Sequence, residues 1–235
     1  MSRRVFVVGT DTGVGKTAVT AALLHTARDR GVRMVPFKPA QSGEDDPSDI
    51  ERLLDAAGLD RSNVDVACPL RFDPPLAPGL AEDAAPFLDV TSQLPTHERT
   101  PPGAVLDALD RWEALTQPSV TLVEGAGGLQ VPMPGATWQG SWISALAART
   151  LIVGRAGLGT INHTLLTIDA LRHLGRPPLG FILSQTSTAT DPSVDDNARV
   201  IETASGVAHL GTLPHGPEPA SAPALLDALL SRLEL

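Results

Sequence analysis

The stretch Val5–Thr17, VFVVGTDTGVGKT, decides the fold of this 235-residue chain. It begins with a short apolar run, VFVVG, of the kind that forms a strand covered on both faces. A glycine-rich turn follows, and Lys16 and Thr17 open a segment of helical period. A strand, a glycine-rich loop and a helix in this order are typical of a phosphate-binding loop, whose backbone N–H groups and helix N-terminus face the phosphates.

In such a loop the lysine reaches the terminal phosphates and the following hydroxyl binds Mg²⁺. The usual pattern places four residues between the first glycine and the Gly-Lys pair, whereas Gly9 and Gly15 enclose five. The order of strand, loop and helix still favours a phosphate loop over a turn that only packs a helix onto a sheet. The expected nucleotide-binding residues of this segment are Gly13, Val14, Gly15, Lys16 and Thr17.

Outside this segment, short apolar runs alternate with longer segments of helical period. The expected strands are Val5–Gly9, Arg33–Phe37, Ser119–Val123, Leu151–Gly154, Leu179–Leu183 and Val207–Gly211. The expected helices are Lys16–Arg28, Ser48–Ala57, Ala104–Ala114, Ile161–Leu174, Val194–Ala204 and Ala222–Leu233. This alternation predicts an α/β fold with a doubly wound, mainly parallel sheet of about seven strands. Because no repeat or shift in composition divides the chain, we expect one domain, 1–235.

Residues 69–103 break the alternation, because they are rich in proline and show no clear period. They are expected to form a long loop with one short helix, and loops of that length in compact domains are usually functional or disordered.

Composition and charge exclude several classes of protein. The net charge of −9 and the 3% of aromatic residues argue against a general nucleic-acid binder. The single cysteine, Cys68, excludes a disulfide within the chain and is expected to be buried. Neither a signal-peptide core nor an apolar stretch of about 18 residues is present, so we expect a cytoplasmic protein without a membrane partner.

A phosphate loop needs a further carboxylate for its metal, at the end of a neighbouring strand. Glu124 provides one, directly after the expected strand Ser119–Val123, and small residues follow it. They allow close approach of a ligand, so Gly125, Ala126 and Gly127 join Glu124 among the expected nucleotide-binding residues.

Four motifs together resemble the dethiobiotin synthetase family, and they extend over nearly the whole chain. They are GTDTGVGKT at 9–17, FKPAQSG at 37–43, VEGAGGL at 123–129 and GLGTINHTLLT at 157–167. The resemblance implies a P-loop NTPase fold and an ATP-dependent ligase of biotin biosynthesis. Its substrates would be 7,8-diaminononanoate, CO₂ and ATP, joined into a cyclic urea through a carbamate and a carbamic–phosphoric anhydride.

The resemblance also implies roles for single residues. Lys38 would lie over the substrate amines and carbamate, although a lysine after a strand is by itself more often a surface charge. Thr12 and Ser42 would contact the substrate, and Thr12, Lys16 and Lys38 would be the catalytic residues. Asp49 would hold magnesium together with Thr17 and Glu124, whereas by position alone it is an ordinary acid of a first helical turn.

The residues Gly159, Thr160, Ile161 and Asn162 open an expected helix. In the family such N–H groups bind the substrate carboxylate from the partner subunit, which implies a homodimer. His163 follows and is assigned no catalytic role, because it can simply cap or orient the helix.

Three positions depart from the family pattern. Gly13 stands where an acidic residue is common, and Ser141 stands where an aspartate is usual, between Trp138 and Trp142, which we expect to pack. Ser184 and Gln185 replace an asparagine that reads adenine, which suggests a looser choice of nucleotide. The family loop that lines the base pocket corresponds to Pro214, His215 and Gly216.

Two alternatives share the phosphate loop. A P-loop ATPase switch of the chromosome-partitioning type, acting through dimerisation and partner binding, typically has a second lysine within the loop, which is missing here. A synthetase of the cobyrinate amidase type needs an added glutaminase domain, which this chain lacks.

Overall fold

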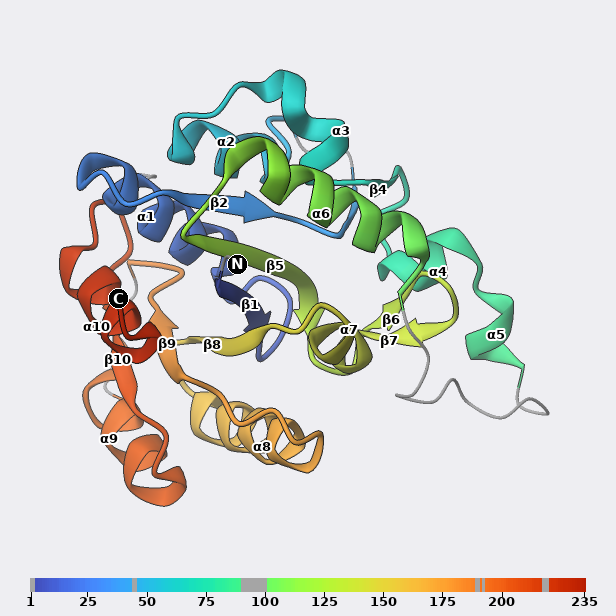
Figure 1. The fold of residues 1–235 in the computed structure, drawn as a ribbon. Coiled ribbons are helices and arrows are strands. Elements are labelled where there is room, and N and C mark those ends of the chain that lie inside the picture. Colours follow the sequence, from blue (N-terminus) through green and yellow to red (C-terminus); the bar gives the residue numbers. More distant parts are fainter. Residues whose placement is uncertain (1–2, 44–45, 90–100, 189–190, 192, 217–219) are drawn as a thin grey trace.

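The computed structural model describes residues 3–43, 46–89, 101–188, 191, 193–216 and 220–235. Its centre is a six-stranded sheet in the order β10-β9-β8-β1-β5-β2, and all neighbouring strands are parallel (Figure 1). The strands are β1 (Arg3–Gly9), β2 (Met34–Phe37), β5 (Val120–Gly128), β8 (Arg149–Arg155), β9 (Gly180–Ser184) and β10 (His209–Leu213). The predicted α/β class with a parallel sheet is therefore confirmed.

Two small sheets account for the remaining described strands. β3 (Ala40–Ser42) pairs in parallel with β4 (Leu70–Phe72), and β6 (Pro132–Met133) pairs antiparallel with β7 (Thr137–Trp138). The main sheet thus has one strand fewer than the roughly seven that the sequence predicts, because these short pairs lie outside it.

Helices cover both faces of the sheet (Figure 1). The helices α1 (Lys16–Asp29) and α10 (Pro223–Leu233) pack with one apolar cluster of the strands. The helices α6 (Gly103–Thr116), α7 (Gln139–Ala145), α8 (Thr160–His173) and α9 (Val194–Ser205) pack with the other. α2 (Asp49–Ala57) contributes side chains to both clusters, as expected of a helix beside the edge strand β2.

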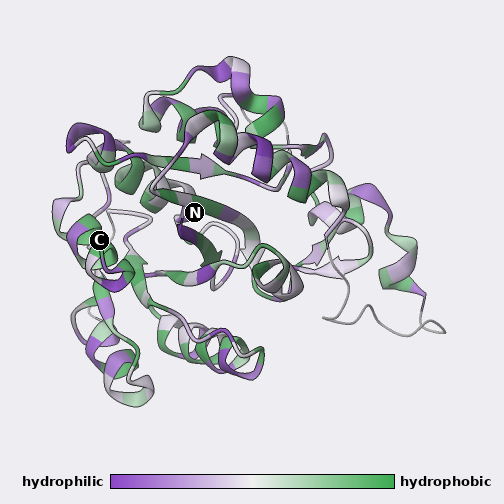
Figure 2. Ribbon diagram, in the orientation of Figure 1, coloured by the Kyte–Doolittle hydropathy of each residue, from purple (hydrophilic) through white to green (hydrophobic). Residues whose placement is uncertain are grey.

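The apolar runs form strands because both of their faces are covered. In β1 the last five residues are all buried, and Figure 2 shows that the central strands are mostly hydrophobic. The helices instead bury one stripe each, as Ile168 and Leu171 do in α8. The predicted bounds of the six main helices agree with the structure to within two residues.

The segment 69–103 has more structure than the single short helix expected of it. Besides β4 it contains α4 (Pro78–Glu82) and α5 (Ala85–Leu88), preceded by the short η1 (Arg61–Asn63) and α3 (Val64–Ala67). Proline at the first helical position favours the start of α4. Gly79 lets this helix approach β6, since a Cβ there would lie 2.7 Å from the backbone N and O of Met133. Residues 90–100 lie outside the described residues.

The order of the strands fixes where a ligand can bind. From β1 the chain passes through α1 to β2, β5 returns between these two strands, and β8 lies on the other side of β1. Ligands of open parallel sheets bind beyond the carboxyl ends of the strands, where the chain turns in opposite directions. The glycine-rich loop after β1 lies at this edge. Among the described residues, no helix is both long enough and apolar enough to cross a membrane.

Candidate active site

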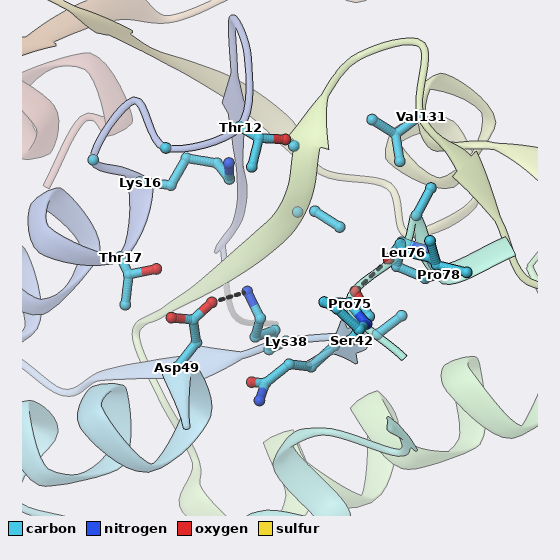
Figure 3. A pocket seen from close by; sticks show the side chains of 18 of the residues that line it. Thr12, Lys16, Thr17, Lys38, Ser42, Asp49, Pro75, Leu76, Pro78 and Val131 are labelled. Atoms are coloured by element: carbon cyan, nitrogen blue, oxygen red, sulfur yellow. Dashed lines mark hydrogen bonds and ion pairs between the residues drawn. The ribbon is translucent and has the colours of Figure 1, made fainter. Parts of the chain in front are cut away.

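A cavity of about 590 Å³ opens at the carboxyl ends of β1, β2 and β5 (Figure 3). Most of the residues predicted to bind phosphate, metal or substrate line it: Thr12, Gly13, Gly15, Lys16, Thr17, Lys38, Ser42, Asp49, Gly125, Ala126 and Gly127. Figure 3 shows Thr12 and Lys16 on the glycine-rich loop, with Lys38 and Asp49 facing them. Segments far apart in the sequence therefore meet in one cavity.

The glycine-rich loop has the backbone that a phosphate cradle needs. Gly13 and Gly15 have φ angles of 71° and 90°, which side chains disfavour. A Cβ on Gly9 would lie 2.7 Å from the carbonyl oxygens of Asp11 and Gly127, so this glycine allows the loop to pass close to β5. Val14 does not line the cavity and instead packs, 2% exposed, into the core beneath it.

Lys16 points back across the loop. Its Nζ lies 3.5 Å from the carbonyl oxygen of Asp11, and its side chain is buried. Burial lowers the pKa of Lys16, although the nearby carboxylate of Glu124 opposes this effect. An ammonium group with so few partners is suited to an anion such as phosphate.

Glu124 is more deeply buried than a solvated loop acid, with no exposed surface. It lies within β5 rather than after the strand, because β5 continues to Gly128. One of its oxygens, Oε1, accepts hydrogen bonds from the Thr17 hydroxyl at 2.9 Å and from the Lys38 ammonium at 2.8 Å. The other, Oε2, is buried and has no hydrogen-bond partner among the described residues.

Lys38 joins two acids. Its Nζ lies 2.8 Å from Glu124 and 3.0 Å from Asp49 Oδ2, and only 3% of the residue is exposed (Figure 3). Burial alone would lower the pKa of Lys38, but the two carboxylates outweigh it and raise this pKa. Burial would likewise raise the pKa of Asp49, and the Lys38 charge outweighs it and lowers that pKa. Both shifts favour the charged forms, so Lys38 and Asp49 form an ion pair at neutral pH.

The donor set at this cluster fits a magnesium ion. Thr17, Asp49 and Glu124 offer hydroxyl and carboxylate oxygens, the ligands that Mg²⁺ prefers, and Glu124 Oε2 is an unused acceptor. The described residues contain no cluster of three or more His, Cys, Asp or Glu side chains able to hold a metal by themselves. A magnesium ion here would thus need nucleotide phosphates as further ligands, as is usual for Mg²⁺.

Several residues that line the cavity were not predicted. They are Ala18, Ala40, Gln41, Arg52, Pro75, Leu76, Ala77, Pro78 and Val131. The segment 75–78 belongs to the proline-rich stretch, and the Ser42 hydroxyl donates a hydrogen bond of 2.5 Å to the Leu76 carbonyl (Figure 3). The length and composition of that stretch indicated a functional loop, but nothing in it indicated which residues face the site.

A smaller cavity of about 170 Å³ adjoins the glycine-rich loop. The five residues expected near the nucleotide base all line it: Ser184, Gln185, Pro214, His215 and Gly216. Gly15 and Ala18 line both cavities, so one elongated ligand can occupy the two. Ser184 lies so close to the loop that a Cβ on Gly15 would approach its hydroxyl to 2.4 Å.

The start of α8 lies outside both cavities. Gly159 precedes the helix with a φ of 91°, Thr160 is buried, and Asn162 is exposed. His163 lines a different cavity of about 360 Å³, together with Thr12 and Leu166. Within one subunit, Gly159, Thr160, Ile161 and Asn162 are therefore not brought to the phosphate loop.

The aromatic residues on either side of Ser141 pack against protein groups. Trp142 is completely buried and its Nε1 donates to the Thr137 hydroxyl at 2.6 Å, while Trp138 meets Phe87 edge to face at 5.6 Å. Ser141 is 4% exposed and its hydroxyl donates to the Trp138 carbonyl.

Cys68 is buried as predicted, and burial raises the pKa of its thiol to about 12.

A parallel sheet with a glycine-rich loop between β1 and α1 and acids at the neighbouring strands defines a P-loop nucleotide-binding protein. A family model described as an AAA domain matches residues 3–221. The chain is 39% identical over 231 residues to the ATP-dependent dethiobiotin synthetase BioD of Anaeromyxobacter dehalogenans (strain 2CP-C), covering 97% of each chain. It is 36% identical over 200 residues to that of Haloferax mediterranei, covering 85% of this chain and 79% of the relative. The chain belongs to the ATP-dependent dethiobiotin synthetase family.

Solved structures share the fold at much lower identity. The MinC:MinD cell division complex of Aquifex aeolicus matches with a TM-score of 0.58 at 12% identity, covering 100% of this chain and 97% of that chain. A ParA family ATPase from Chlorobium tepidum TLS matches with a TM-score of 0.51 at 15% identity, covering 98% and 90%. These likenesses support the P-loop fold alone, and the partitioning-type switch is not favoured.

Proposed function

We propose that this chain closes the ureido ring of dethiobiotin from 7,8-diaminononanoate, CO₂ and ATP, with Mg²⁺, releasing ADP and phosphate. Membership of its family makes it an ATP-dependent ligase of biotin biosynthesis. The observation that carries the residue roles is the position of Lys38, which lies at the end of β2 in the same cavity as the phosphate loop. A phosphate loop that only binds and hydrolyses nucleotide has no need of a buried ammonium group outside the loop, at the end of another strand.

The reaction divides into three steps. One substrate amine captures CO₂ as a carbamate, and a carbamate oxygen then attacks the γ-phosphorus of ATP as ADP leaves. The second amine attacks the carbonyl carbon of the resulting anhydride, phosphate leaves, and the ring is closed. No side chain acts as a nucleophile, so the protein contributes positioning and stabilisation of charge.

Two ammonium groups line the cavity, and they would match the charges that develop. Lys16 would stabilise the transferred phosphoryl group, and Lys38 the carbamate. Because its pKa is raised, Lys38 stays protonated and acts as a fixed positive charge rather than as a base. Thr12 and Ser42 line the same cavity and would contact the diamine.

Thr17, Asp49 and Glu124 would hold the magnesium ion. Bound there, Mg²⁺ would neutralise negative charge on the phosphates of the nucleotide. In the structure Lys38 forms ion pairs with Asp49 and Glu124. It would therefore be free to turn toward the carbamate if these two acids held the metal. Gly13, Gly15, Gly125, Ala126 and Gly127 line the phosphate end of the cavity, and the residues of the smaller cavity would receive the base.

The same proposal includes a homodimer in the cytoplasm, without nucleic-acid or membrane partners. The N–H groups at the start of α8 are suited to a carboxylate, yet they lie outside the cavity of their own subunit. A partner subunit that presents this helix start would complete the site for the aliphatic acid end of the diamine.

The purified protein tests the proposal directly. With 7,8-diaminononanoate, bicarbonate, Mg²⁺ and ATP it should release phosphate and form dethiobiotin in equal amounts, measured by a phosphate assay and mass spectrometry. Omission of the diamine should abolish both, and so should Lys16→Ala. Phosphate release that is unchanged without the diamine would instead indicate a switch ATPase.

A further inference from the structure

A second cavity, nearly as large as the active site, lies at the opposite end of the sheet. Its volume is about 520 Å³, against about 590 Å³ for the cavity at the phosphate loop. Met34 and Trp112 form buried parts of its wall, and Leu115 stands at its rim with 64% of its surface exposed. Cavities of this size with mostly apolar walls and a few polar groups are typical small-molecule sites.

The charges around this cavity are positive. Arg28 and Arg33 line it, and among the described residues no Asp or Glu does. Arg28 already donates to His25 Nδ1 and to the Asp55 carbonyl, and it pairs with Asp29. Arg33 is exposed, and its guanidinium has no hydrogen bond or ion pair within the described ranges. The cavity therefore offers one uncompensated cation beside an apolar wall, which suits a monoanion.

The edge strand β2 adds a backbone donor. β2 pairs only with β5 in the main sheet, and its outer edge is seen in two contacts: Trp112 Nε1 donates to the Pro36 carbonyl at 2.7 Å, and Lys38 N–H donates to the Ala67 carbonyl. Backbone groups alternate between the two edges along a strand. Met34, two residues before Pro36, therefore directs its N–H toward the same outer side, next to Arg33.

We propose that this cavity binds a medium-chain aliphatic monocarboxylate. The chain would lie against Met34, Trp112 and Leu115, and the carboxylate would bind the Arg33 guanidinium and the Met34 N–H. A guanidinium is well matched to a carboxylate because it can donate two parallel hydrogen bonds. A single free cation fits one negative charge better than the several charges of a nucleotide or a phosphate ester.

The cavity is joined to the active site by three elements. α1 begins with Lys16 at the phosphate loop and carries Arg28 at its other end, and β2 leads from Met34 directly toward Lys38. α2 begins with Asp49 and ends with Ala57, which also lines the second cavity. The helices α1 and α2 thus line both cavities, and β2 lines the second cavity and ends next to Lys38 in the first. A ligand that changed their spacing at one end would alter the catalytic cluster at the other, and by this route the bound carboxylate would regulate the ligase.

Binding can be tested independently of activity, with nonanoate as the probe. The chain has three tryptophans, so a ¹⁵N-labelled sample gives three indole N–H signals, of which Trp112 belongs to this cavity and Trp142 to the core near α7. Nonanoate should shift the Trp112 signal saturably and leave the Trp142 signal in place. Nonylamine at the same concentration should shift neither signal. Arg33→Ala should weaken binding at least about tenfold, as expected for loss of a charge-assisted hydrogen bond.

Two further variants distinguish the cavity from general effects. Leu115→Glu places a negative charge on the exposed rim and should abolish the shift. Arg199→Ala removes another exposed arginine, one that lies outside this cavity, and should leave the shift unchanged. An unmoved Trp112 signal, or an equal shift in the wild type and Arg33→Ala, would overturn the site while leaving the proposed function intact.

The regulatory part rests on the proposed function and is tested in the coupled phosphate assay. With saturating diamine, nonanoate should change the KM for ATP at least about fivefold in the wild type and leave Arg33→Ala unaffected. Competition of nonanoate with the diamine in the active site would persist in Arg33→Ala, because Arg33 lies outside that cavity. An equal effect in both proteins, or binding without any change in KM or kcat, would overturn the regulatory role.

Discussion

At the scale of residues, the two lysines of the chain are reserved for the active site. Lys16 and Lys38 are the only two lysines of the sequence, and the other 16 basic residues are arginines. Both lysines line the active-site cavity, whereas Arg61 and Arg71, for example, make exposed ion pairs. A lysine carries a compact charge on a flexible stem that can follow a reacting group, while arginine suits fixed, forked pairing. The chain thus keeps its mobile cations for the chemistry.

The buried position of Lys38 predicts two separable effects of Lys38→Met. Turnover should be lost, because no other group of the cavity replaces the charge over the carbamate. The apo protein should also lose about 3 kcal/mol of stability, since Glu124 and Asp49 would be left facing each other without their cation. Urea unfolding measures this loss.

Added Mg²⁺ and ADP should restore part of the lost stability in Lys38→Met, because the metal would neutralise the same two acids. Unfolding that is identical to the wild type, or full turnover in the variant, would show that Lys38 has neither role.

The smaller cavity, which is expected to receive the nucleotide base, predicts that the enzyme accepts several nucleoside triphosphates. Ser184 and Gln185 stand where the family has the asparagine that reads adenine, so the edge of a purine would lack the amide of that asparagine. We expect ATP, GTP and CTP to support dethiobiotin synthesis with kcat/KM values within about tenfold of one another, since one missing hydrogen bond is worth about that factor. The measurement is a panel of nucleoside triphosphates in the phosphate assay. Ser184→Asn should raise the preference for ATP, and a wild-type enzyme that uses ATP alone would contradict the prediction.

At the scale of elements, the sequence predicts single strands and helices but not the contacts between distant segments. Apolar runs and helical periods predict the six main strands and the six main helices, because each element's own residues show which of its faces is buried. The contact of Lys38 with Glu124 is different. It exists because β5 inserts between β1 and β2, and this pairing joins residues 86 positions apart. Without the family resemblance, Lys38 and Asp49 would have been taken for surface charges.

The position of the segment 75–78 at the cavity was even harder to predict from the sequence. Pro75 and Pro78 face the cavity because α4 packs on β6 through Gly79, a contact between segments that share no periodic pattern. Glu124, by contrast, could be found from sequence because small residues follow it, even though the expected end of its strand was wrong by five residues.

The start of α2 predicts a stability effect that reaches the site. Ser48 precedes the helix, and both its N–H and its hydroxyl donate to Glu51, at 2.8 and 2.7 Å. This arrangement fixes the first turn, on which Asp49 lies. Ser48→Ala should lower the free energy of unfolding by about 1 kcal/mol and weaken Mg²⁺-dependent ATP binding. Chemical denaturation and calorimetric titration measure the two effects.

The same contact carries a pH dependence. The Ser48 hydrogen bonds lower the pKa of Glu51, so their stabilisation is present above the unfolded pKa of about 4.3 and is lost as the pH falls through the folded value. The difference in stability between the wild type and Ser48→Ala should therefore shrink below about pH 4. A difference that stays constant down to pH 3 would mean that Glu51 does not contribute.

At the scale of the whole molecule, the active site is open where a second subunit is expected. The helix α8 exposes Leu166 at 61%, and Leu158, just before the helix, is exposed at 81%. Leu166 also lines the cavity of about 360 Å³ that lies between this helix and the phosphate loop, next to Thr12. An exposed leucine beside an active-site cavity is a candidate interface residue, and a symmetric dimer is the commonest way to cover such a face.

Leu166→Glu tests whether this face joins two copies of the chain. The wild type should elute with twice the monomer mass of 24.5 kDa in light scattering, and the variant, with a charge in the apolar contact, should be monomeric. Because the start of α8 would then no longer meet the partner's cavity, the KM for the diamine should rise at least about tenfold, while the affinity for ATP stays unchanged. Leu235→Glu, which alters a leucine 51% exposed at the far C-terminus, is the matched control and should remain dimeric. A monomeric variant with an unchanged KM would show that each subunit binds its diamine alone, and a wild-type monomer would remove the shared site altogether.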